Sequence, residues 1–281
     1  MFNFAKLLFK VEISDSTDGY LLFRIKNHFP KAFVDASALT GDRNAVEVVF
    51  AQALATDPAA LRRFQKPPLP FAFHIPQIPA FKNHEFNCSI VLSIVGSAIN
   101  HLSTFIVAVK LAVSELSSEC SIRMSVTHCF AVTNGGELAE ITPEGDGLVL
   151  MSGEENIVAI NPLKLELMTP LRLIRQGHVI QSLSFSIFAC SIMRRVSSLA
   201  YYYGGAELDF NYKWLSEIST LARVENANIS FGKWPNLGVG ILGSLEFNDV
   251  HPDLYQFLRM GEEFNLGKNA AFGNGEFRMI I

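Results

Sequence analysis

The chain ends in the stretch Gly261-Glu-Glu-Phe-Asn-Leu-Gly-Lys-Asn-Ala-Ala-Phe-Gly-Asn-Gly-Glu-Phe-Arg-Met-Ile-Ile281, where four glycines precede a short apolar run. This pattern predicts a loop that leads into a final β-strand. Gly261, Gly267, Gly273 and Gly275 permit positive φ angles, and their lack of Cβ atoms lets a backbone or a polyanion approach closely. Successive exposed N–H groups beside Lys268 would form a cradle for a phosphate.

A glycine-rich hairpin without a ligand is the alternative that the glycine content leaves open. A nucleotide P-loop is excluded, because its pattern G-x-x-x-x-G-K-[ST] is not met. Five residues instead of four separate Gly261 from Gly267, and Asn269 stands where the magnesium-binding hydroxyl is required.

The run from Leu258 to Arg278 resembles the glycine-rich signature of the CRISPR-associated precursor-RNA-processing endoribonucleases of the RAMP superfamily. That signature is roughly G-x-G-K-x-x-x-F-G-x-G-x-[FY], and Asn265 or Leu266 stands in place of its first glycine. Three upstream segments resemble the family in the same order. The positions shared with the signature are Lys268, Phe272, Gly273, Gly275 and Phe277, and the upstream segments are Phe64–Phe73, Thr169–Gly177 and Met193–Gly205.

Alternating strand and helix patterns predict an α+β protein, and the length of 281 residues suits two domains. The resemblance implies two tandem ferredoxin-like (RRM-related) domains, which we place at residues 1–158 and 159–281, the second with the glycine-rich loop. Period-two alternation predicts a strand over Lys6–Ile13, and a second apolar run, Tyr20–Ile25, could pair with it as a hairpin. Apolar residues at helical spacing predict long helices over Ala98–Leu116 and Ser182–Tyr202.

Composition limits where and how the protein can bind nucleic acid. The net charge is −4, so an RNA site must be a local basic patch. The four cysteines lack C-x-x-C spacing, so we expect buried thiols, no metal site and no cofactor. No apolar run reaches the length of a membrane span and no signal-peptide cleavage site is evident, so we expect a cytoplasmic protein that contacts no membrane.

The resemblance implies metal-independent cleavage of CRISPR repeat RNA to mature guide RNA, leaving a 2′,3′-cyclic phosphate. In many relatives a histidine lies near the first helix of the N-terminal half, but the predicted helix over Asn44–Ala55 holds Gln52 and no histidine. The nearest substitute is His28, which Lys26 and Lys31 flank. We therefore predict His28 and Lys31 as catalytic residues.

The predicted RNA-binding residues follow from the glycine signature and from cations near it. Lys268 has the strongest case, because the signature places it among loop amides, whereas a solvated helix face is the alternative for Arg194. The implied partners are CRISPR repeat RNA and other CRISPR-associated proteins, and a homodimer stays open. A non-catalytic RNA binder or a protein-interaction subunit of a CRISPR effector complex is the alternative function. The full predicted RNA-binding set is Lys268, Gly267, Gly273, Gly275, Arg194 and Arg172.

Overall fold

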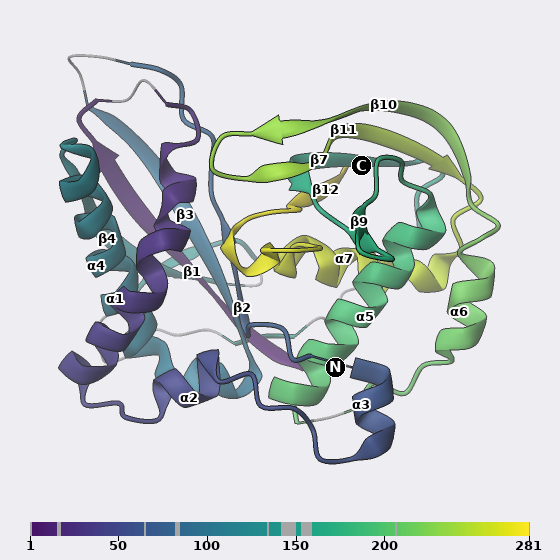
Figure 1. The fold of residues 1–281 in the computed structure, drawn as a ribbon, viewed down its shortest axis with the longest axis horizontal. Coiled ribbons are helices and arrows are strands. Elements are labelled where there is room, and N and C mark those ends of the chain that lie inside the picture. The colour runs from purple at the N-terminus through teal and green to yellow at the C-terminus, as the bar shows by residue number, and fades with distance from the viewer. Residues whose placement is uncertain are drawn as a thin grey trace. The chain divides into compact units, whose positions relative to one another are not determined.

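A computed structural model describes all residues except 1, 16–17, 65, 82–84, 134, 142–149, 153–158, 206 and 281. The chain forms two compact units (Figure 1). The N-terminal unit comprises Asn3–Ala53 and Leu69–Met151, and the C-terminal unit comprises Met1–Phe2, Leu54–Pro68 and Ser152–Ile281. The predicted boundary after residue 158 falls next to residues outside the described part of the chain and stays a prediction.

The N-terminal unit is built on an antiparallel sheet in the order β2-β3-β1-β4-β5, and β6 also pairs with β1. Its strands and helices follow each other as strand, helix, strand, strand, helix, strand, which is the ferredoxin-like pattern. The strands are β1 (Asn3–Ile13), β2 (Phe71–His74), β3 (Phe86–Val95), β4 (Met124–Val132), β5 (Leu138–Glu140) and β6 (Leu150–Ser152), and the helices are α1 (Ile25–Thr40), α2 (Ala45–Phe50) and α4 (Leu102–Cys120).

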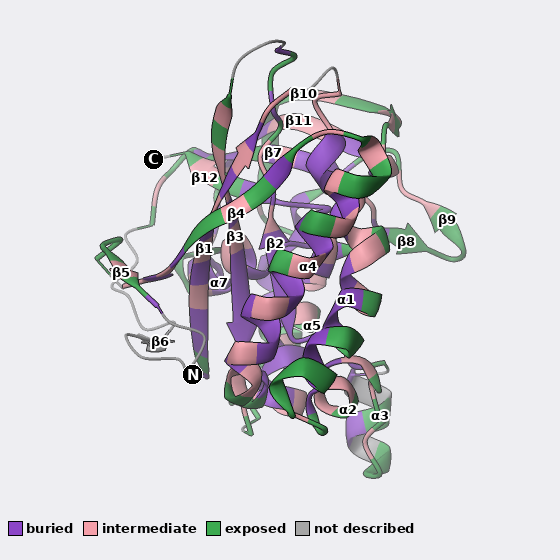
Figure 2. Ribbon diagram, turned by 90° about the vertical axis from the view of Figure 1, so that its left-hand side faces the viewer, coloured by how far each residue is buried: buried purple, intermediate pink, exposed green. Residues whose placement is uncertain are grey.

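The strand expected over Tyr20–Ile25 is wrong, because a short 3-10 helix, Leu21–Arg24, leads directly into α1 there. Pro30 lies inside α1 and removes one helical hydrogen bond. Packing outweighs that loss: the fully buried Phe29 lies 4.9 Å from Phe73 and 5.4 Å from Phe71, measured between ring centroids. Figure 2 shows the buried stripe of α1 beside that of α4.

The C-terminal unit repeats the same topology, with an antiparallel sheet in the order β10-β11-β7-β12. Both units thus have the tandem ferredoxin-like arrangement that was predicted. Its strands are β7 (Leu163–Leu171), β10 (Arg223–Trp234), β11 (Gly238–Asn248) and β12 (Phe277–Ile280), a separate hairpin is formed by β8 (Ile174–Arg175) and β9 (His178–Val179), and the helices are α3 (Pro58–Phe64), α5 (Phe185–Tyr203), α6 (Tyr212–Ile218) and α7 (Tyr255–Phe264).

The two long helices occur where their apolar spacing predicted them. Ser184 caps α5 by accepting a hydrogen bond from the N–H of Ile187. The stretch Gly96–Cys120, which contains α4, is long and apolar enough to cross a membrane by length and composition, contrary to expectation. Half of its most apolar window is buried within the fold, as in the core helix of a globular unit.

Candidate nucleic-acid interface

The glycine-rich loop is fastened to the end of β7 by backbone hydrogen bonds within the C-terminal unit. The N–H of Lys268 donates to the carbonyl of Arg172 at 2.9 Å, and the N–H of Gly275 donates to the carbonyl of Pro170 at 3.1 Å. The N–H of Leu266 donates back to the carbonyl of Gly275 at 3.0 Å. These bonds close the loop on itself and hold Lys268 beside Arg172.

Two buried polar side chains lock the same loop from inside. Thr169 Oγ1 donates to the carbonyl of Gly273 at 2.7 Å and accepts the N–H of Glu276 at 2.9 Å. Asn274 Nδ2 donates to the carbonyl of Leu237 at 2.8 Å. Since a buried polar group left without such a bond costs free energy, these contacts select one loop conformation.

The glycines are needed because the loop passes close to other backbone. Gly267 has φ +87°, and a Cβ there would lie 2.5 Å from the carbonyl oxygen of Arg172. Gly275 has φ +67°, and a Cβ there would lie 1.9 Å from the carbonyl oxygen of Leu266. Asn265, at the first glycine of the signature, has φ 54° and ψ 178°, a backbone conformation that is otherwise populated almost only by glycine.

The predicted cradle of exposed N–H groups is wrong for the amides of Lys268, Gly273 and Gly275. Each of these amides donates to a backbone carbonyl. Gly273 and Gly275 are also buried, so we expect them to shape the loop rather than to touch a ligand. Gly261 lies in helix α7 and does not have a positive φ angle; its missing Cβ gives room to Ile192 and Phe277. The side chain of Lys268 is exposed and available to a phosphate.

Arg194 and Gly267 line one pocket in the C-terminal unit, on the α5 side of the loop. Three further cations outside the predicted RNA-binding set, Lys66, Arg175 and Arg195, line it too. They come from three separate segments, so no local sequence pattern could have grouped them. The local basic patch expected of an RNA site is therefore present despite the negative net charge.

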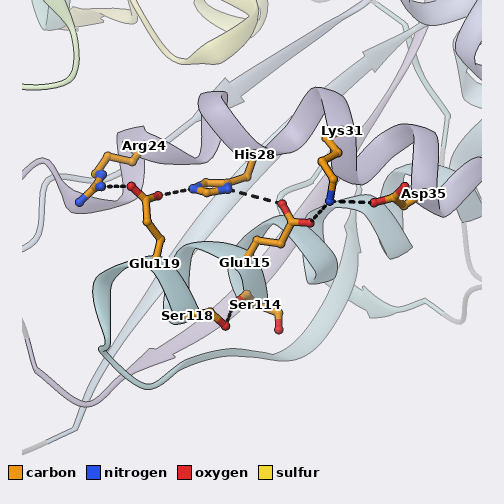
Figure 3. Close-up of polar contacts among 8 residues, drawn as sticks. All are labelled: Arg24, His28, Lys31, Asp35, Ser114, Glu115, Ser118 and Glu119. Atoms are coloured by element: carbon orange, nitrogen blue, oxygen red, sulfur yellow. Dashed lines mark hydrogen bonds and ion pairs between the residues drawn. The ribbon is translucent and has the colours of Figure 1, made fainter.

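His28 and Lys31 lie on one face of α1 in the N-terminal unit and point toward α4 (Figure 3). His28 Nε2 lies 2.5 Å from a carboxylate oxygen of Glu119, and Nδ1 lies 3.4 Å from a carboxylate oxygen of Glu115. Glu119 also pairs with Arg24, and its bond to His28 lowers the pKa of its carboxyl.

Both ring nitrogens of His28 thus face carboxylates, which leaves neither of them free for a substrate in this arrangement. Lys31 Nζ pairs with Glu115 at 2.9 Å and with Asp35 at 3.3 Å. Hydrogen bonds to these two carboxylates raise the pKa of the Lys31 ammonium group, so it stays a cation at neutral pH and cannot serve as a base. The catalytic role of this pair stays a prediction.

A second histidine in the N-terminal unit has a different environment that sequence reasoning missed. His101 Nδ1 lies 2.7 Å from Asp42 Oδ2, and Thr104 Oγ1 donates to the same oxygen at 3.2 Å. The polar contact of the His101 side chain within the described part of the chain is made through Nδ1, and the side chain is 11% exposed. Asp42 follows the end of α1 and His101 precedes α4, so only the fold brings the two together.

The described residues contain no group of three or more His, Cys, Asp or Glu side chains arranged to hold a metal ion. Residues 165–277 match the family of CRISPR-associated endoribonuclease Cas6. This confirms the predicted resemblance for the segment that contains β7, α5 and the glycine-rich loop. A comparison with curated protein sequences found no match.

Solved Cas6 structures share the fold of the chain. A Cas6 product complex has a TM-score of 0.59 at 12% identity, with 100% of both chains covered. The Thermus thermophilus Cas6 has a TM-score of 0.56 at 12% identity, covering 100% of this chain and 99% of that one. A chain of a partial Cas6-RT-Cas1–Cas2 complex has a TM-score of 0.60 at 10% identity, and the match covers 100% of this chain and 46% of that one.

Proposed function

We propose that the protein is an endoribonuclease that cleaves CRISPR repeat RNA to mature guide RNA. The match of residues 165–277 to the Cas6 endoribonuclease family carries this proposal. The likeness of the fold to Cas6 product and substrate-mimic complexes supports it. The basic pocket beside the glycine-rich loop supports RNA as the substrate, because phosphate binding requires local positive charge.

The proposed reaction is attack of a 2′-hydroxyl on the adjacent phosphate. It leaves a 2′,3′-cyclic phosphate and a 5′-hydroxyl. The reaction needs a base at the 2′-hydroxyl, an acid at the departing 5′-oxygen and cations near the phosphorane. No water molecule has to be activated, so we propose a metal-independent reaction.

We assign the base to His101. In the imidazole tautomer whose Nδ1–H donates to Asp42 Oδ2, the lone pair lies on Nε2, where a proton can be accepted. His28 and Lys31 remain the sequence-based alternative, in which His28 has to leave at least one of its two carboxylates before it can transfer a proton.

A non-catalytic RNA-binding subunit is the second candidate function. It is favoured by the engagement of both His28 nitrogens with Glu115 and Glu119, which suits a structural clamp between α1 and α4. Other CRISPR-associated proteins are proposed partners, since the chain is similar in fold to part of a chain in a Cas6-RT-Cas1–Cas2 complex.

The deciding experiment incubates the purified protein with repeat RNA in excess EDTA and analyses the product ends. Cleavage that persists and leaves a cyclic phosphate supports the nuclease, and a 2′-deoxy nucleotide at the cut site should abolish it. Products that bear a 5′-phosphate, or loss of cleavage in EDTA, would exclude the reaction. Tight binding without cleavage would identify the second candidate.

A further inference from the structure

The C-terminal unit contains a pocket of about 580 Å³, which lies within the usual size range of small-ligand sites. Its walls come from α5, from the β8–β9 hairpin, from Leu266 and Gly267 of the glycine-rich loop, and from Phe64, Lys66 and Pro68. All of these segments belong to the same compact unit.

The lining of the pocket is rich in cations. Lys66, Arg175, Arg194 and Arg195 line it, and its described lining contains no aspartate or glutamate. Arg175 and Arg194 are exposed at the rim. Four cations without a carboxylate, in a protein of net charge −4, set up a local positive potential that attracts an anion.

Arg195 is the most telling of these cations. Its Nε donates to the carbonyl of Phe264 at 2.8 Å, which fixes the guanidinium. Its Nη2 is buried and has no partner among the described residues. Burial lowers the pKa of Arg195 to about 10, so the group is still charged at neutral pH. A half-buried guanidinium whose Nη2 lacks an acceptor is costly, and a bound phosphate would supply both a counter-charge and the missing acceptor.

Part of the lining is an apolar wall, which suits a base or a sugar. Ile174, Ile180 and Ile187 line it, and Ile174 is 49% exposed. Ser186 also lines the pocket, and its hydroxyl group lies 3.1 Å from Ser219 Oγ. Apolar surface with a few oriented polar groups is typical of pockets that take a small organic ligand.

The hairpin that carries Ile174 and Arg175 is a two-stranded ladder separate from the four-stranded sheet. Its turn places Gln176 at φ 52° and Gly177 at φ 81°. Since two strands alone are only marginally stable, this wall can adjust to a ligand at little cost.

We propose that this pocket binds one unpaired nucleotide of RNA, with its phosphate on Arg194 and Arg195 and its base against the isoleucine wall. That the nucleotide belongs to an RNA chain rests on the proposed function. A free phosphate would leave the apolar wall uncovered. A paired base is stacked on both faces, so only an unpaired nucleotide can enter a pocket of this shape.

The test is calorimetric binding of three probes to the purified protein: adenosine 5′-monophosphate, adenosine and inorganic phosphate. We expect the nucleotide to bind at least about tenfold more tightly than either fragment, because it contacts both the cations and the apolar lining. Arg194→Ala and Arg195→Ala should each weaken nucleotide binding about tenfold or more. Lys213→Ala is the matched control, since Lys213 is 89% exposed on α6 and does not line the pocket.

Arg194 is exposed, so its variant tests the pocket even if Arg195→Ala fails to fold. Phosphate binding as tight as nucleotide binding, or an Arg194→Ala protein that binds the nucleotide like the parent, would overturn the proposal. Cleavage of repeat RNA by the parent protein is measured separately. If the parent protein cuts RNA but fails the nucleotide test, the pocket proposal is refuted and the nuclease proposal stands. If it passes the nucleotide test but does not cut RNA, the nuclease proposal is refuted and the pocket proposal stands.

Discussion

Replacing Gly275 with alanine should destabilise the C-terminal unit far more than an ordinary glycine substitution. Gly275 has φ +67°, and its added Cβ would lie 1.9 Å from the carbonyl oxygen of Leu266. That oxygen belongs to the backbone of the same loop, so it cannot move aside as a flexible side chain would. The neighbouring bonds from Gly275 to Pro170 and from Leu266 to Gly275 would have to lengthen.

The expected magnitude has two parts. A residue with a Cβ in the left-handed region costs about 1–2 kcal/mol. Forcing an extra carbon into a packed site costs a further 1–3 kcal/mol or so. The sum is about 2–5 kcal/mol, and at about 2–4 °C per kcal/mol it lowers the melting temperature by roughly 4–20 °C.

Gly205→Ala is the matched control, because Gly205 has a similar φ of +69° and a Cβ there would meet nothing within 4 Å. It should cost only the conformational part, about 1–2 kcal/mol. The assay is urea unfolding followed by tryptophan fluorescence. The two tryptophans, Trp214 and Trp234, both lie in the C-terminal unit, so the signal reports that unit alone.

An equal loss of unfolding free energy in the two variants would refute the reasoning. The close approach of Gly275 to Leu266 would then have no energetic weight, and the loop would tolerate a side chain. If Gly275→Ala loses more unfolding free energy than Gly205→Ala, and Lys268 is still exposed, the role of Gly275 is to shape the loop rather than to contact a ligand.

Three further predictions concern binding, catalysis and thiol chemistry. Lys268→Ala should flatten the salt dependence of RNA binding by about one phosphate contact, whereas Lys213→Ala should not; equal slopes would remove Lys268 from the interface. His101→Ala and Asp42→Asn should each slow cleavage by a factor of roughly 10²–10⁴ with little change in RNA affinity. If His28→Ala loses that much activity and His101→Ala cuts normally, the sequence-based assignment of His28 is restored. Burial raises the pKa of Cys88 to about 11, so its alkylation should accelerate about tenfold per pH unit from pH 8 toward pH 11, because only the thiolate reacts; a rate that is flat with pH would contradict this.

The fold class could be predicted from the sequence because each ferredoxin-like unit repeats strong local signals. The helical spacing in Ala98–Leu116 and Ser182–Tyr202 predicted α4 and α5. The stretch that contains α1 was misassigned, since Pro30 and the apolar run before it obscured the helical period. Tertiary packing of Phe29 against β2 decides the helix there, and that contact cannot be read from local propensity.

The sequence by itself determined the family resemblance and the glycine-rich loop, because positive φ angles and close backbone approach demand glycine at fixed spacing. Only the tertiary structure decided how the polar groups are used. In the folded chain, N–H groups of the loop donate hydrogen bonds to carbonyls at the end of β7, and Asp42 pairs with His101. Both ring nitrogens of His28 lie next to carboxylates. The fold also gathers Lys66, Arg175 and Arg195 around one pocket. These groupings join residues far apart in the chain, and hydrogen bonds and charge act through space rather than along the sequence.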